Sequence, residues 1–87
     1  MIKKAPRGPY WAYMVQCQYG TYYAGWTNDL KKRIAAHNEG TGAKYLRGKG
    51  PVKLVYKRKF NTLKKAQAQE RLIKSLTRKK KEALLYE

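Results

Sequence analysis

The chain has 87 residues, a length that predicts one domain and excludes a two-domain enzyme. Its 43% apolar and 13% aromatic residues are typical of a globular protein and exclude a disordered one. The 21 Lys and Arg against 5 Asp and Glu give a formal charge of +16, whose self-repulsion a polyanion relieves. We therefore expect nucleic acid as the partner, ahead of an acidic membrane surface or a charge that is only solvated.

A single cysteine and a single histidine limit the chemistry of the chain. Cys17 lies in an apolar run and cannot form an internal disulfide, so we expect a buried, reduced thiol. One His and one Cys exclude the usual zinc sites. No signal-peptide pattern and no stretch of membrane-spanning length is visible, which predicts a cytoplasmic protein without membrane contact.

The N-terminal part of the chain predicts a basic arm followed by a β-hairpin. Residues 1–9 carry prolines and cations, and we expect a flexible arm ahead of a folded domain over 10–87. The apolar, Tyr-rich run 10–18 predicts a strand that is covered on both faces. Tyr19-Gly20 is a turn signal, and 21–24 predicts the second strand.

A helix is predicted to follow the hairpin, with Gly25 closing the second strand before it. Thr27 or Asn28 is expected to cap this helix, and Asp29 places an acid in its first turn. Gly40 is expected to stop the helix, as glycine commonly does at a helix C-terminus.

The C-terminal part predicts a strand over 52–60, a helix over 63–76 capped by Asn61 or Thr62, and a last helix over 78–86. The resulting order is ββαβαα. It predicts an α+β fold, in which a three-stranded antiparallel sheet is flanked by three helices.

Two basic segments predict contacts to phosphates. Residues 40–51 form a Gly-rich loop whose spacing fits neither a P-loop nor a dinucleotide fingerprint. Residues 78–81 place cations in a first helical turn, against the helix dipole, which makes sense if phosphates approach; a solvated charge run is an equal alternative. The cations predicted to bind nucleic acid are Lys32, Lys44, Arg47, Lys49, Arg78, Lys79 and Lys80.

Tyr13 and Tyr23 lie on the two strands of the predicted hairpin, where their side chains can emerge near each other. A phenol with a reference pKa of about 10 is a poor base, but neighbouring cations lower that pKa. A phenol of lowered pKa can take a proton from water during attack on phosphorus. The alternative is that both tyrosines only pack in the sheet.

Arg33 and His37 are four residues apart on the first predicted helix and therefore share a face. Arg33 can grip a phosphate with two parallel hydrogen bonds, and His37 can accept or relay a proton near neutral pH. The alternative is that Arg33 is one of many surface cations and that His37 merely ends a helix.

Glu70 stands on the core-facing stripe of the second predicted helix, beside Ala66 and Ile73. A carboxylate there is costly unless it is paired or holds a metal. Mg²⁺ commonly takes only one or two protein carboxylates and keeps waters and substrate phosphate as its other ligands, so one Glu suffices. The alternative is an ion pair with a nearby lysine or arginine.

In their order along the chain, these residues resemble the GIY-YIG nuclease superfamily, and in particular its small stand-alone members. The first tripeptide of the family stands here as Trp11-Ala12-Tyr13, and the second as Tyr23-Ala24-Gly25. The segment 27–34 is similar to the helix that carries the family arginine, and His37 matches the histidine after it. Glu70 falls where the metal-binding glutamate of the family is expected.

The resemblance implies a metal-dependent endonuclease that hydrolyses phosphodiester bonds, of DNA ahead of RNA, to a 5′-phosphate and a 3′-hydroxyl. It implies that Tyr13 or Tyr23 acts as general base or orients the water. Arg33 would bind the scissile phosphate and His37 would assist the proton transfer. Glu70 would hold one Mg²⁺ or Mn²⁺ ion.

The competing hypothesis is a non-catalytic module that binds nucleic acid on the same scaffold, through phosphate contacts and stacking. Glu70 separates the two hypotheses, because a pure binder gains nothing from an acid that faces phosphates. A third interpretation, a ribosome-associated or structural protein, rests only on the charge.

Overall fold

The computed structural model describes residues 8–40 and 51–86. Its elements are β1 (Tyr10–Gln16), β2 (Tyr22–Thr27), α1 (Leu30–Glu39), β3 (Lys53–Phe60), α2 (Leu63–Ser75), α3 (Arg78–Ala83) and the 3-10 turn η2 (Leu84–Tyr86). The order ββαβαα confirms the predicted α+β fold. None of the helices in these residues is long and apolar enough to cross a bilayer.

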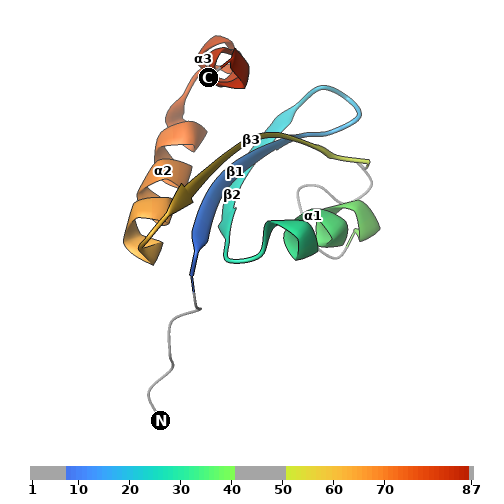
Figure 1. Cartoon of the computed structure of the whole chain (residues 1–87). Coiled ribbons are helices and arrows are strands. Elements are labelled where there is room, and N and C mark those ends of the chain that lie inside the picture. The colour runs from blue at the N-terminus through green and yellow to red at the C-terminus, as the bar shows by residue number, and fades with distance from the viewer. Residues whose placement is uncertain (1–7, 41–50, 87) are drawn as a thin grey trace.

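Strand β1 is the middle strand of an antiparallel sheet with the order β2-β1-β3. Because side chains alternate along a strand, β1 contributes to the core on both faces, as predicted. Figure 1 shows α1 and α2 on opposite sides of this sheet. On the α2 side the buried cluster is Ala12, Met14, Ala24, Tyr56 and Ile73. On the α1 side it is Tyr13, Val15, Cys17 and Val52.

Strand β2 is longer than the sequence predicts. It was expected to end at Ala24, but its pairing with β1 continues as far as Trp11 opposite Thr27. The prediction that Gly25 closes the strand is therefore wrong. Gly25 lies inside the ladder, directly opposite Tyr13.

Helix α1 begins at an aspartate cap. The side chain of Asp29 accepts a hydrogen bond from the Lys32 N–H at 3.1 Å. The predicted cap at Thr27 or Asn28 is wrong, because the Thr27 hydroxyl instead accepts from the Asp29 N–H at 3.0 Å and shapes the preceding turn. Gly40 ends the helix in the left-handed conformation, with φ of 80°, as predicted.

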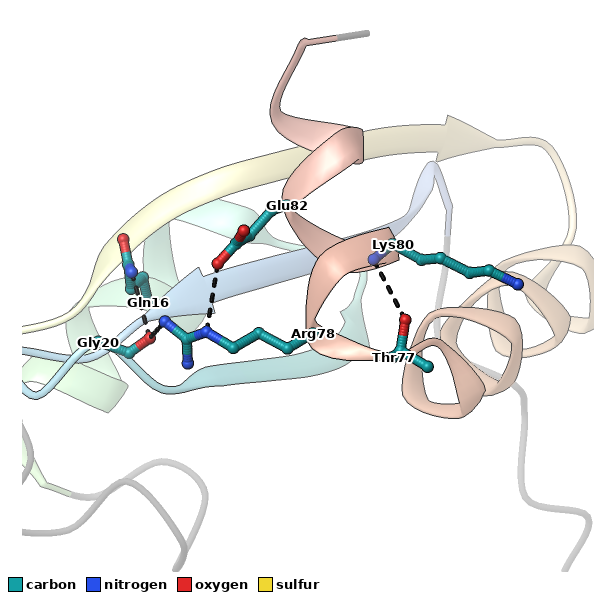
Figure 2. A network of polar contacts seen from close by, with 6 residues as sticks. All are labelled: Gln16, Gly20, Thr77, Arg78, Lys80 and Glu82. Carbon is teal, nitrogen blue, oxygen red and sulfur yellow. Dashed lines mark hydrogen bonds and ion pairs between the residues drawn. The ribbon is translucent and has the colours of Figure 1, made fainter.

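Helix α3 is held to the β1–β2 turn, as Figure 2 shows. The Gly20 carbonyl accepts hydrogen bonds from Arg78 Nη2 at 3.1 Å and from Gln16 Nε2 at 3.2 Å. Arg78 Nε also donates to Glu82 Oε1 at 3.2 Å, and its guanidinium lies 5.2 Å from the centroid of the Tyr22 ring. The last helix ends at Ala83, earlier than predicted, where the tighter turn η2 takes over.

The side chain of Tyr13 occupies the space that a side chain at position 25 would need. A Cβ on Gly25 would lie 2.5 Å from the Tyr13 hydroxyl oxygen and 2.8 Å from its Cζ. Tyr13 is fully buried, so its ring has little room to move away. Glycine at position 25 is therefore required by the path of the Tyr13 ring and not by a turn.

We expect Gly25→Ala to lower the free energy of unfolding by about 1–3 kcal/mol, because the methyl group overpacks the Tyr13 ring. Urea denaturation measures this loss. Part of it should disappear in a Tyr13→Phe background, where the closest atom is absent. Gly40→Ala is the control: among residues 8–40 and 51–86 no atom within 4 Å meets its Cβ, so its cost is attributed to the positive φ and should not depend on residue 13. The prediction would be contradicted if Tyr13→Phe reduced the loss of unfolding free energy by the same amount for Gly25→Ala and for Gly40→Ala.

Candidate active site

The centre of the site is a hydrogen bond between two buried side chains. The Tyr13 hydroxyl oxygen lies 2.8 Å from His37 Nε2, joining β1 to α1. Tyr13 is 1% exposed and His37 is 2% exposed. His37 lies in the last turn of α1, as the alternative interpretation has it, and its ring is in addition buried against Tyr13.

Burial raises the pKa of Tyr13 above its usual value. The Arg33 guanidinium opposes this rise through its charge and through a hydrogen bond to the hydroxyl, whereas Tyr23 and Glu70 add to it. The prediction that nearby cations lower the phenol pKa is therefore wrong for Tyr13. Desolvation raises the pKa of the Tyr13 phenol by more than Arg33 lowers it, so the phenol stays protonated at neutral pH.

Burial also lowers the pKa of His37, and the positive charge of Arg33 lowers it further. A neutral imidazole keeps one ring nitrogen as an acceptor. Since burial keeps the phenol protonated and the imidazole neutral, we assign the phenol proton to the bond with His37 Nε2 and the imidazole proton to Nδ1. The Tyr13 hydroxyl thus donates to His37, and the positive charge of Arg33 acts on both groups.

Tyr23 stands at the outer side of this group. Its ring meets the His37 ring edge-on, with the ring centroids 5.8 Å apart. Tyr23 is only half-buried, so it is closer to solvent than Tyr13. The Lys74 Nζ lies 5.8 Å from the centroid of the Tyr23 ring.

Glu70 approaches the same region from α2. Its Oε1 lies 3.5 Å from Lys74 Nζ, so the ion pair that the sequence left open as an alternative is present. The Glu70 side chain is 18% exposed and that of Lys74 is 50% exposed, which makes this a weak, hydrated contact. The Glu70 charge also acts on the Tyr13 phenol. Lys74 is not predicted from the sequence as a partner of Glu70. The spacing of four residues between them on one helix is the sequence feature that indicates such a pair.

Two hollows open along β2, which is an edge strand and receives residues from both helices. The first, of about 280 Å³, is lined by Trp26, Thr27, Asn28, Asp29, Lys32, Arg33 and Ala36. The second, of about 260 Å³, is lined by Trp26, Gln67, Glu70 and Arg71. Trp26 lines both, so it stands between the cations of α1 and the carboxylate of α2.

The structure brings all five residues that the sequence proposed for catalysis into one region: Tyr13, Tyr23, Arg33, His37 and Glu70. The proposed phosphate-binding cations are more scattered. Lys32, Lys79 and Lys80 are exposed. Arg78 is exposed too, but its guanidinium is engaged within the fold. Lys44, Arg47 and Lys49, with their loop, and residues 1–7 of the predicted arm lie outside the described residues.

A family model described as the GIY-YIG catalytic domain matches residues 9–83 of this chain. The match covers the sheet, both long helices and α3. The chain therefore belongs to the GIY-YIG family, whose members are nucleases.

Similar proteins in other organisms are small as well. The chain is 52% identical to the UPF0213 protein CPE1444 of Clostridium perfringens over 86% of this chain and 81% of that one. It is 47% identical to the UPF0213 protein YazA of Bacillus subtilis, over 86% and 76% of the two chains. Among solved structures, the NMR structure of EF2693 from E. faecalis matches with a TM-score of 0.62 and 39% identity, over 92% and 85% of the two chains.

Stability should fall when the pH is lowered from about 8 to about 5, and His37 should cause the fall. The folded state holds the pKa of His37 below that of the unfolded chain, so the unfolded state binds more protons in this range and gains on acidification. Above the unfolded pKa the contribution is complete. The measurement is the urea unfolding free energy as a function of pH.

His37→Gln should remove this pH dependence, because the chain has no other histidine. The variant is expected to be less stable than the parent near pH 8, where it lacks the buried ring, and to lose less on acidification. Parallel pH curves for the two proteins would contradict the assignment.

We expect Lys79→Gln with Lys80→Gln to reduce the salt dependence of DNA binding by a slope of about 1–2, one unit or less for each lost phosphate contact. Binding is measured in chelator, with a labelled oligonucleotide, over a series of salt concentrations. Arg78→Gln is the comparison: it should instead lower the free energy of unfolding by about 1 kcal/mol, because it breaks the bond to Gly20. An unchanged slope in the lysine variant would show that these two lysines are idle.

Proposed function

We propose that the protein is a metal-dependent endonuclease that hydrolyses phosphodiester bonds of nucleic acid, DNA ahead of RNA. The observation that carries the proposal is the convergence of Arg33, Tyr23 and Glu70 around the buried Tyr13–His37 pair. Membership of a nuclease family supports the reaction class. The formal charge of +16 supports a polyanionic substrate.

Arg33 binds the phosphate. Its charge acts on the buried Tyr13 hydroxyl, while the residue itself is exposed and lines a hollow. A guanidinium has five N–H groups that can donate to phosphate oxygens, two of them in parallel. Such donors, placed beside the hollow by α1, would stabilise charge that builds at the phosphate.

Tyr23 handles the attacking water, and Tyr13 positions its neighbours. Tyr13 is buried, neutral and hydrogen-bonded to His37, so water does not reach it. Tyr23 is half-buried and lies against the same imidazole. His37 is held neutral by burial and assists the transfer by accepting the Tyr13 hydroxyl and packing against the Tyr23 ring, which orients Tyr23 toward the water. The water oxygen bonds to phosphorus while one of its protons leaves through the Tyr23 hydroxyl to the solvent, and the bond to the 3′ oxygen breaks, with that oxygen taking a proton from solvent to form the 3′-hydroxyl.

Glu70 fits a hard divalent cation. Its carboxylate lines an open hollow, and its contact with Lys74 is long at 3.5 Å and involves a half-exposed lysine, so a metal can displace Lys74. Within residues 8–40 and 51–86 no group of three His, Cys, Asp or Glu forms a closed cage for a metal. Mg²⁺ or Mn²⁺, which keeps most of its waters, suits such a site. When bound, one such ion would supply positive charge to the phosphate oxygens.

We assign this activity to one domain over residues 10–87, with residues 1–9 as a basic arm. We also assign the protein to the cytoplasm. Cys17, the single cysteine of the sequence, supports this assignment, because a buried thiol that is hydrogen-bonded to the Thr21 hydroxyl suits a reducing compartment.

Glu70→Gln should lower the cleavage rate by about 10³-fold or more, because the ion then lacks its protein carboxylate. Binding in chelator should be unchanged or tighter, since one negative charge near the phosphates is gone. The measurement uses end-labelled DNA and RNA with Mg²⁺, with Mn²⁺ and with chelator.

Glu39→Gln is the matched control for this experiment. Glu39 is an exposed acid at the end of α1, so the variant loses the same charge outside the site and should cleave normally. Normal cleavage by Glu70→Gln would contradict the assignment of Glu70 as the metal ligand. Tight, salt-sensitive binding without cleavage in the parent protein would move the function to the non-catalytic binding module.

A further inference from the structure

Trp26 is placed beside the candidate active site without a role in it. It follows Gly25 in the edge strand β2 and is half-buried. It lines the hollow that contains Arg33 and also the hollow that contains Glu70. A ligand that lies across the sheet edge between these two side chains must therefore pass the indole.

The two tryptophans of the chain differ in what lies against their rings. The Nζ of Lys57 lies 5.7 Å from the centroid of the Trp11 ring. In the described part of the chain, no aromatic ring or cation is stacked on the Trp26 indole. Trp26 is thus an aromatic surface that the fold holds in a strand and does not use for its own ring contacts.

Cations stand on both sides of this indole. Lys32 and Arg33 line the hollow on the α1 side, and Arg71 lines the hollow on the α2 side. A nucleotide carries one phosphate on each side of its base and sugar. An aromatic ring flanked by cations is the arrangement that binds a strand through stacking and backbone contacts together.

We propose that Trp26 is a nucleobase subsite, where the base next to the scissile phosphate stacks on the indole while Arg33 and Arg71 hold the flanking phosphates. The position of this base next to the scissile phosphate rests on the proposed function, but the stacking itself requires no cleavage. The subsite takes any base, because each has a flat π face. The base must be free of its neighbours on at least one side.

The test uses Trp11→Phe, which leaves Trp26 as the only indole fluorophore in the chain. The protein is titrated in chelator with a short single-stranded oligonucleotide, and separately with an abasic strand of equal length and charge. We expect quenching of Trp26 fluorescence by the first strand and little by the second. Trp26→Leu should weaken binding of the base-containing strand about 5- to 100-fold, and Trp26→Phe should restore much of it.

Equal quenching by both strands, or undiminished affinity in Trp26→Leu, would overturn the proposal. If Trp26→Leu does not fold, as judged by circular dichroism, the two titrations of Trp11→Phe decide alone. The outcome is separable from the proposed function. Base-dependent quenching without metal-dependent cleavage would support the subsite and contradict the nuclease function. Glu70-dependent cleavage without such quenching would support the nuclease function and contradict the subsite.

Discussion

The hydrogen bond between Tyr13 and His37 depends on the absence of a side chain at position 25. The Tyr13 ring lies across Gly25, where a Cβ would be 2.5 Å from its hydroxyl oxygen. In this path the hydroxyl reaches His37 Nε2 at 2.8 Å and lies within the field of the Arg33 charge. The rest of the site follows from this contact, because it holds α1 against β1 and brings the His37 ring against Tyr23.

The position of β2 at the sheet edge explains how a small fold assembles a site from two opposite faces. Helices α1 and α2 cover different sides of the sheet, and a central strand would keep their side chains apart (Figure 1). At an open edge, residues of both helices can approach the same strand. Arg33 comes from one helix and Glu70 from the other, so opposite charges flank β2 without neutralising each other directly.

The sequence predicted the element order, because caps, glycine stops and apolar alternation are local signals. It also named the five residues that converge, because the family resemblance relates positions that are far apart in the chain. The sequence-based predictions are wrong where the outcome depends on which side chains the folded chain buries. The pKa of Tyr13 rises because the ring is buried, which no count of nearby cations reveals. The sequence predicts a strand end at Gly25, although this glycine lies inside the ladder and leaves room for the Tyr13 ring of the neighbouring strand. Lys74 was overlooked among many lysines.

Strand β1 and the β1–β2 turn both take partners from distant parts of the chain. The ribosome completes β1 and β2 long before β3, so the second side of β1 has no strand partner until residues 53–60 are made. The Gly20 carbonyl accepts from Arg78, which lies 58 positions later in the chain. Pairing over such separations is slow and leaves apolar strand edges exposed. The formal charge of +16 makes copies of the chain repel one another, which opposes edge-to-edge pairing of such strands.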